Sequence, residues 1–205
     1  MSLSRRDLLL GAAASALTAC ASSPPRNISN ACDIFTQKRS WYRATRRAEK
    51  KWGVPIALQL AIIRQESSFD RDAKPGRKKF LFVFPGARKS SARGFPQAIE
   101  QTWEQYKKAT RNRGANRRNF KDATDFVGWY CTESSKRLGI AKNNAYQQYL
   151  AYHEGWGGYS KGSFRGKTTL QASARRVSES AARYDAQLNR CEKKFRRGIP
   201  LIPGI

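Results

Sequence analysis

The segment IALQLAIIRQESSF spans residues 56–69 and decides the fold. Pro55 precedes it, at the position where proline favours the first turn of a helix. The first half of the segment is almost entirely apolar, and a helix that is apolar on every side is usually buried. We therefore predict a buried helix from Ile56 to about Ser67, with Glu66 near its carboxyl end.

Glu66 is the residue of this segment that is suited to acid–base chemistry. Burial beside Ile62 and Ile63 disfavours its charged carboxylate, and the negative end of the helix dipole acts in the same direction. Arg64 acts in the opposite direction. If burial dominates, Glu66 keeps its proton near neutral pH and can act as a general acid. The alternative is a surface or ion-paired glutamate.

Helical patterns lie on both sides of this segment. Residues 41–52 place an apolar stripe opposite basic residues, and Gly53 ends the pattern. Further helical patterns cover residues 97–109, 122–138 and about 144–153. Between them, residues 70–96 are rich in proline, glycine and basic residues around one apolar run at 80–84. This composition predicts an irregular or small β region.

The clearest helical pattern begins near residue 170. Its apolar residues alternate gaps of four and three: Leu170, Ala174, Val177, Ala181, Tyr184, Leu188 and Cys191. Because Cys191 lies on this stripe, we expect it to pair with Cys32 at the start of the domain, which would contribute about 2–4 kcal/mol. Cys131 is expected to be a buried thiol, and the cysteine spacings fit no metal site.

The first twenty residues predict export. Arg5 and Arg6 precede an apolar stretch that is too short to span a bilayer, in a pattern resembling a twin-arginine signal. The stretch ends in LTAC, which resembles a bacterial lipobox and implies acylation of Cys20; Ala21 favours the periplasmic face of the outer membrane. We expect an export signal at 1–19, a lipid-anchored tether at 20–35, one domain at 36–195 and a tail at 196–205.

Basic residues dominate the charge of the chain. Its 40 Lys and Arg against 15 Asp and Glu give a formal net charge of +25. Such a balance favours anionic polymers, including cell-wall material, anionic lipid and nucleic acid. The basic residues are scattered, no glycine-rich phosphate loop or zinc spacing accompanies them, and the export signal is present, so we expect no nucleic-acid partner.

Three short motifs follow one another at fixed spacing. ESSF at 66–69 ends the buried helix, SARGFPQ at 91–97 is followed by Thr102, and AYHEG lies at 151–155. This ordered set resembles the soluble lytic transglycosylase family across roughly residues 41–160. The resemblance implies a mainly α, lysozyme-like fold, with several helices around a buried catalytic helix and a small irregular or β region.

The resemblance also implies roles for individual residues. Glu66 matches the catalytic glutamate, and Ser67 matches a serine that helps to hold it. Ser91 and Gln97 match polar groups around the N-acetylmuramic acid site. Tyr152 matches a tyrosine that points at the glutamate and fixes its carboxyl group.

Some positions depart from the family pattern. Phe95-Pro96 replaces Leu-Met, so the cleft wall differs there in shape. His153 replaces an asparagine and is either a substrate contact, an auxiliary proton carrier or a hydrogen-bonded helix-end residue. Glu154 adds a second carboxylate near the cleft. From its place in the glycine-rich segment, Trp156 is expected to line the cleft; the other helical aromatic residues are expected to be core.

The resemblance implies a single-acid mechanism that needs no cofactor. Glu66 would protonate the β-1,4 glycosidic oxygen between N-acetylmuramic acid and N-acetylglucosamine, then deprotonate the muramic C6 hydroxyl, leaving a 1,6-anhydro end. The expected partners are peptidoglycan strands and, through the lipid, a membrane; a monomer is expected. The alternatives are a hydrolytic muramidase that uses Glu154 or Asp70 as second acid, and a non-catalytic lipoprotein that binds peptidoglycan or anionic lipid.

Overall fold

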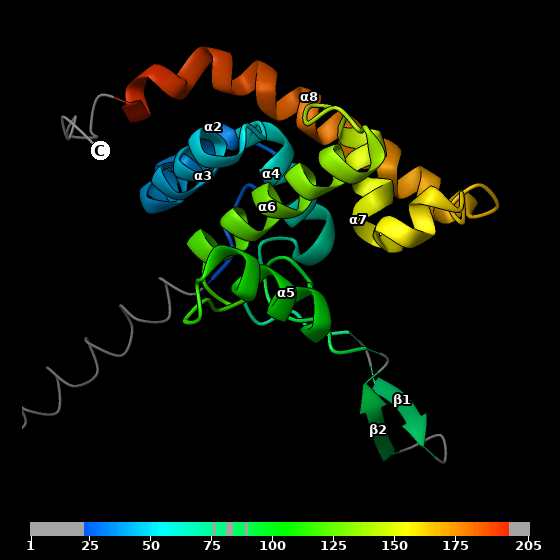
Figure 1. Ribbon diagram of the computed structural model, residues 1–205. Helices are drawn as coiled ribbons and strands as arrows, with labels where there is room; N and C mark the ends of the chain where they lie inside the picture. The colour runs from blue at the N-terminus through cyan, green and yellow to red at the C-terminus, as the bar shows by residue number, and fades with distance from the viewer. Residues whose placement is uncertain (1–22, 76, 81–83, 89, 197–205) are drawn as a thin grey trace, which may run out of the picture.

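The structure is a computed structural model that describes residues 23–75, 77–80, 84–88 and 90–196 (Figure 1). This part of the chain is mainly helical, as predicted. In chain order its elements are α2 (Ala31–Gln37), α3 (Arg39–Trp52), α4 (Ile56–Ser67), β1 (Arg77–Phe80), β2 (Phe84–Arg88), α5 (Glu100–Thr110), α6 (Phe120–Leu138), α7 (Ala145–Ser160) and α8 (Thr168–Arg196).

Helix α4 lies at the centre of the helical body. Its residues from Ile56 to Ile63 are all buried, and it packs mainly against α8. Gln59 is buried among them and donates its amide to the carbonyls of Thr45 and Val54, at 3.2 and 2.9 Å. Full burial of one such aliphatic side chain contributes roughly 1.5–3 kcal/mol, so α4 is a principal source of stability and a rigid base for Glu66.

Aromatic side chains fill the space around α4. Trp41 of α3 stacks on Phe120 with ring centroids 3.9 Å apart and contacts Phe95 of the loop before α5. Five helical aromatic residues that were expected to be core are buried, namely Trp103, Tyr106, Trp129, Tyr130 and Tyr149. The aromatic core therefore holds the segment before α5 against α3 and α6.

The folded part begins earlier than residue 36. Ala31, Ile34 and Phe35 of α2 are fully buried, and the Tyr184 hydroxyl donates to the carbonyl of Ile28. The tether predicted to extend to residue 35 is therefore too long, because its apolar residues join the core. Cys20 and residues 197–205 lie outside the described residues.

Helix α8 buries the stripe predicted for it. Leu170, Val177, Tyr184 and Leu188 are all buried. Cys191, at the end of the stripe, is joined to Cys32 by a disulfide that spans 159 residues of sequence, and Cys131 is a buried free thiol. Among the described helices, none is both long and apolar enough to cross a membrane.

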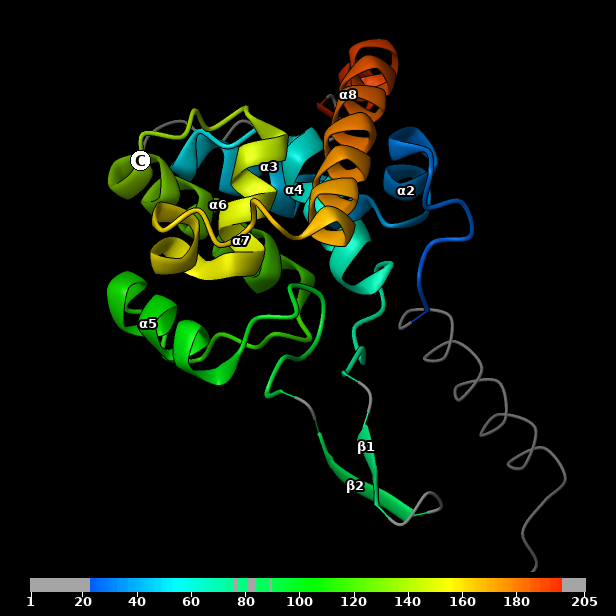
Figure 2. The ribbon, with the colours of Figure 1, turned by 90° about the vertical axis from the view of Figure 1, so that its right-hand side faces the viewer.

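The region between α4 and α5 contains a small antiparallel hairpin. Strands β1 and β2 pair Arg77 with Arg88 and Phe80 with Phe84, and the hairpin stands out from the helical body (Figure 2). Helix α7 is interrupted at Gly155, whose φ of 73° and ψ of 163° are readily adopted only by glycine. The helix predicted to end near residue 153 therefore kinks and continues.

Candidate active site

A cavity of about 450 Å³ opens beside the carboxyl end of α4. Helices α4, α6 and α7 and the loop before α5 supply its wall. The polar side chains in this wall include Glu66, Gln97, Tyr130, Tyr152, His153 and Glu154. The structure therefore brings together the motifs at 66–69, 91–97 and 151–155, which are far apart in the sequence.

Glu66 is half-buried in the last turn of α4. Burial raises the pKa of its carboxyl group from 4.5 to about 7, and a hydrogen bond with the Tyr149 side chain opposes this rise. Arg64 donates instead to the Ser29 hydroxyl at 3.1 Å. Near neutral pH the carboxyl group of Glu66 is therefore divided between its acid and base forms.

Tyr149 makes the contact with Glu66 that was expected of Tyr152. The hydroxyl of Tyr152 donates to the carbonyl oxygen of Pro96 at 2.6 Å. Burial raises the pKa of the Tyr152 phenol well above its usual value, and the nearby charge of Glu66 raises it further. The expected role of Tyr152 is therefore corrected. The signal that could have found Tyr149 is its spacing, because residues three apart on a helix share a face.

The SARGFPQ motif forms a tight loop in the cavity wall. Gly94 has a φ of 70°, and a Cβ atom there would lie 2.2 Å from the carbonyl oxygen of Arg117. Gln97 donates its amide to the carbonyls of Gly94 and Ala73, at 2.8 and 2.9 Å. Gln97 thus holds the loop closed while it lines the cavity.

The hydroxyl groups of the two serines predicted for the site form hydrogen bonds with backbone groups. The hydroxyl of Ser91 accepts the backbone N–H of Glu100 at 3.0 Å, and Ser91 lies outside the cavity wall, to which its neighbour Ser90 belongs. The hydroxyl of Ser67 donates to the carbonyl of Ile63 at 3.1 Å, on its own helix. Both expected roles are corrected, because each hydroxyl satisfies a backbone group at a helix end.

Trp156 does not line the cavity. Its indole N–H donates to the Ser134 hydroxyl at 3.0 Å, its ring stacks on Tyr130 at 4.8 Å, and Arg137 covers it at 4.2 Å. These contacts draw the indole into the packing of α6. Tyr130, whose ring supports the indole, lines the cavity together with Phe126 and Tyr152.

Glu154 is a second carboxylate in the same cavity. It pairs with Lys167 at 2.7 Å, accepts a hydrogen bond from Ser163, and lies 3.2 Å from Nδ1 of His153. The Lys167 contact, followed by that of Ser163, lowers its pKa to about 2. His153 lines the cavity with its side chain 52% exposed, so it remains accessible to a ligand.

The other predicted rivals of Glu66 are in loops away from the cavity. Asp70 accepts the backbone N–H of Asp72 at 2.8 Å, and Asp72 pairs with Arg118. Neither carboxylate lies in the wall of the cavity. In the described part of the chain, no group of three His, Cys, Asp or Glu side chains could hold a metal ion.

Residues 8–191 of the chain match a known protein family, which is described as the transglycosylase SLT domain. The match includes every helix that supplies the cavity wall. No curated protein matches the chain.

Proposed function

The chain belongs to the transglycosylase SLT domain family, and on that premise we propose that it is a peptidoglycan lytic transglycosylase with Glu66 as its single acid and base. The family confirms the resemblance drawn from the three motifs and the mainly helical, lysozyme-like fold. It also indicates an enzyme that acts on the glycan strands of peptidoglycan. The reaction and the residue that performs it are our proposal.

The pKa of Glu66 carries this proposal. A group that first donates and then accepts a proton works best when its pKa lies near the pH of the reaction. Burial brings the pKa of Glu66 to about 7, and its side chain lines a cavity of about 450 Å³. That volume lies within the usual range for a ligand pocket.

The proposed reaction has two proton transfers. Glu66 first gives its proton to the glycosidic oxygen, and the bond from that oxygen to C1 of N-acetylmuramic acid breaks. The acetamido oxygen of the substrate stabilises the cation that forms at C1. Glu66, now a carboxylate, then removes the proton of the C6 hydroxyl, whose oxygen bonds to C1. The product is a 1,6-anhydro ring, and no water is consumed.

The state of Glu154 supports a single acid. With its pKa near 2 and a direct ion pair to Lys167, Glu154 stays ionised at neutral pH and holds no proton to donate. Tyr149 supplies the hydrogen bond that orients the carboxyl group of Glu66. Each residue thus has one role in the proposed mechanism.

Mass spectrometry of the products tests the proposal. Purified sacculi treated with the wild-type chain should release muropeptides with anhydro ends, and Glu66→Gln should release almost none. Glu104→Gln is the matched control, because Glu104 is 53% exposed on α5 and pairs with Lys107. Lysis of sacculi by Glu66→Gln at the wild-type rate would remove Glu66 as the acid and base. Failure of the wild-type chain itself to release any muropeptide would remove the enzymatic proposal and leave a lipoprotein that only binds the envelope.

A hydrolytic muramidase is the second candidate, favoured by the presence of Glu154 in the same cavity. Glycosidases that use water need two carboxyl groups about 5–9.5 Å apart, and an ionised Glu154 could serve as base or nucleophile. This mechanism gives reducing ends in place of anhydro ends. Reducing ends that disappear in Glu154→Gln would favour it over the transglycosylase.

The cellular location is also part of the proposal. From LTAC at residues 17–20, we propose that the chain is exported, acylated at Cys20 and held at the periplasmic face of the outer membrane. Metabolic labelling with a radioactive fatty acid tests it. Wild type should take up label and sediment with outer membranes, and Cys20→Ala should do neither; uptake of label by Cys20→Ala would contradict the site.

A further inference from the structure

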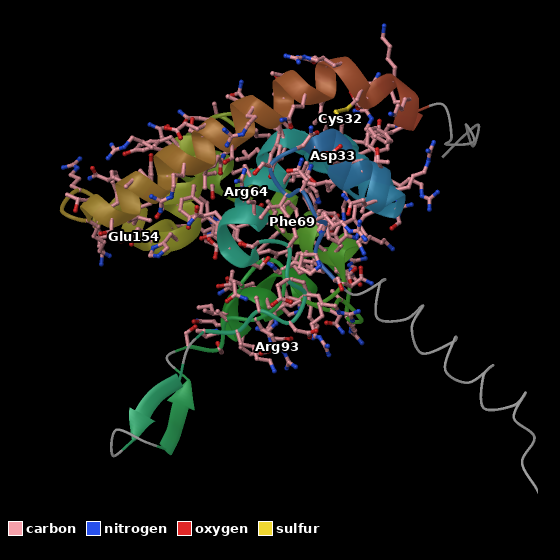
Figure 3. All side chains as sticks on the ribbon, turned by 180° about the vertical axis from the view of Figure 1, so that it is seen from behind. Cys32, Asp33, Arg64, Phe69, Arg93 and Glu154 are labelled. Atoms are coloured by element: carbon pink, nitrogen blue, oxygen red, sulfur yellow. A yellow bond between two sulfur atoms is a disulfide. The ribbon has the colours of Figure 1, made fainter. Side chains whose placement is uncertain are left out.

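A second cavity, of about 420 Å³, lies on the other face of α4 from Glu66. Arg64 and Gln65 of α4 and Ser68, which caps the helix, line it. At 3.6 residues per turn these side chains share one face of the helix, and Glu66 points to the opposite face. Figure 3 shows Arg64 in this part of α4, beside α8, which supplies the facing wall.

The cavity is strongly basic. Arg64, Arg176 and Arg183 line it, and Glu179 is the only acidic side chain in its described wall. Arg176 donates to the Ser173 hydroxyl at 2.7 Å and Arg183 to the Ser180 hydroxyl at 3.3 Å. Both of these partners are uncharged, so the positive charge of the cavity is only partly balanced. We call this site the arginine pocket.

Arg64 has a buried donor that lacks an acceptor. One guanidinium nitrogen, Nη2, donates to the Ser29 hydroxyl at 3.1 Å, and the Tyr184 phenol also interacts with the guanidinium. The other nitrogen, Nη1, is buried with no acceptor in hydrogen-bond geometry among the described residues. Buried polar atoms are usually paired, and an unpaired one destabilises the fold, more so when it is charged. A ligand with an anionic oxygen would satisfy this atom.

One part of the wall is apolar. Ile28, Ala61 and Val177 form it, beside the arginines and the polar side chains of Gln65, Ser68, Glu179 and Ser180. A ligand that fits both parts has an anionic oxygen close to a small apolar group. The C-terminal carboxylate and methyl group of an alanine residue have this combination, whereas a lipid phosphate is flanked by polar groups.

The arginine pocket lies close to the catalytic cavity. Gln65 lines the pocket and is hydrogen-bonded to Tyr149, which is in turn hydrogen-bonded to Glu66. The positive charge of Arg176 also acts on Tyr149. Helix α4 separates the two cavities, and a helix with its side chains is about 10–12 Å across. An extended peptide spans about 3.3–3.6 Å per residue, so a peptide of about four residues attached to a sugar in one cavity is long enough to reach the other.

We propose that the arginine pocket binds the C-terminal carboxylate of a peptide stem carried by the muramic acid residues of the glycan strand. The inference rests on the proposed function, because it assigns the peptide part of the same substrate. Arg64, Arg176 and Arg183 supply the donors for the carboxylate. Ile28, Ala61 and Val177 receive the terminal methyl group.

A binding measurement in the absence of turnover tests the pocket. The full chain carrying Glu66→Gln is titrated calorimetrically with a muramyl peptide that ends in alanine, and then with its C-terminal amide. Adding Arg176→Gln and Arg183→Gln should weaken binding of the acid about tenfold or more, and the amide should bind about as weakly to the parent. Arg175→Gln with Arg190→Gln removes the same charge from exposed positions of α8 outside the pocket and should leave the affinity unchanged.

Several results would overturn the pocket. Equal affinity for the acid and the amide would do so, as would equal losses in the pocket variant and the charge-matched control. Loss of binding to phosphatidylglycerol vesicles in the pocket variant alone, with unchanged binding of the muramyl peptide, would assign the site to a lipid headgroup. Because Arg176 and Arg183 are exposed, an altered circular dichroism spectrum is not expected.

An activity measurement separates this inference from the proposed function. With Glu66 intact, wild type should cleave strands that carry peptides faster than strands stripped by an amidase, and the pocket variant should cleave both at the slower rate. Normal lysis by Glu66→Gln, together with carboxylate-dependent binding in the pocket, would end the proposed mechanism and leave the pocket standing.

Discussion

Two glutamates face one cavity, Glu66 from the end of α4 and Glu154 from α7 just before its kink. The pKa of Glu66 is raised to about 7, whereas the pKa of Glu154 is lowered to about 2. Burial raises the pKa of Glu66, and the hydrogen bond from the Tyr149 phenol offsets only part of this rise. At Glu154 the hydrogen bonds from Lys167 and Ser163 outweigh burial and lower the pKa.

The direction of Arg64 explains part of this difference. It lies one turn from the end of α4 but points into the arginine pocket, on the face opposite Glu66. Lys167, which is thirteen residues from Glu154, returns to the cavity and pairs with it. Burial at the end of an apolar helix therefore sets the protonation of Glu66, whereas the charge of Glu154 depends on a cation that is distant in the sequence.

The largest expected effect separates the two glutamates by activity. Glu66→Gln removes the proton donor, and loss of a general acid typically lowers the rate by about 10²–10⁴-fold. Glu154→Gln should lower the rate no more than about tenfold, because it removes an ion-paired wall residue. Release of soluble muropeptides from sacculi measures both, and similar losses in the two variants would mean that Glu154 shares in the chemistry.

The next effect concerns stability and pH. The folded pKa of Glu66 lies above its unfolded value of 4.5, so the folded chain holds an extra proton between pH 4.5 and about 7. The free energy of unfolding should therefore fall as the pH rises through this range, by roughly 3 kcal/mol at about 1.4 kcal/mol per pKa unit. Urea unfolding of wild type and Glu66→Gln at pH 5 and pH 8 measures it. Parallel pH dependence in the two proteins would place Glu66 in contact with bulk water.

The ion pair of Glu154 should change the pH dependence of the unfolding free energy in the opposite direction. Its lowered pKa stabilises the fold above pH 4.5, and this contribution is lost as the pH falls towards 2. Lys167→Met should cost about 1–2 kcal/mol at pH 7, a figure reduced for the exposure of Lys167, and almost nothing near pH 2. Lys161→Met, at an exposed position nearby, is the control, and equal losses in both variants would show that the pair adds no stability.

The smallest effect concerns Tyr149. Tyr149→Phe removes the hydrogen bond that holds down the pKa of Glu66, so that pKa should rise by less than about one unit. The basic limb of the pH–rate profile should move to higher pH. The maximal rate should fall a few-fold, because the carboxyl group of Glu66 loses the hydrogen bond that orients it. Tyr146→Phe, one turn earlier on α7, should leave the profile in place. A profile that does not move in Tyr149→Phe would leave Tyr149 with a packing role alone.

Helices with regular patterns were predictable from the sequence. α4 has its predicted bounds, and the stripe of α8 is buried, because helical periodicity reports burial directly. The start of the domain could not be predicted from the sequence, because Ile34 and Phe35 are too few to form a periodic pattern by themselves. Their place in the core depends on α8, which follows them by more than 130 residues.

In the candidate site, the environment of a residue was predictable where the sequence of its own helix determines it. Glu66 has the environment expected from the apolar helix before it. The contacts of Tyr149, Tyr152 and Trp156 depend instead on which face of α7 turns towards α4 and α6, and the kink at Gly155 changes that face. The pairing of Glu154 with Lys167 depends on the path of the loop between α7 and α8, which no short spacing reveals.

The disulfide has a mechanical consequence. It joins α2 to the far end of α8 across a sequence separation of 159 residues, so the segment between its cysteines forms one covalent loop. A force applied to the segment before α2 would reach the loop at Cys32, and the disulfide would transmit part of it directly to Cys191 in α8. Helix α2 could not be peeled away from the rest by tension. An enzyme that is held by its amino terminus while it binds a polymer under tension would therefore resist unfolding from that end.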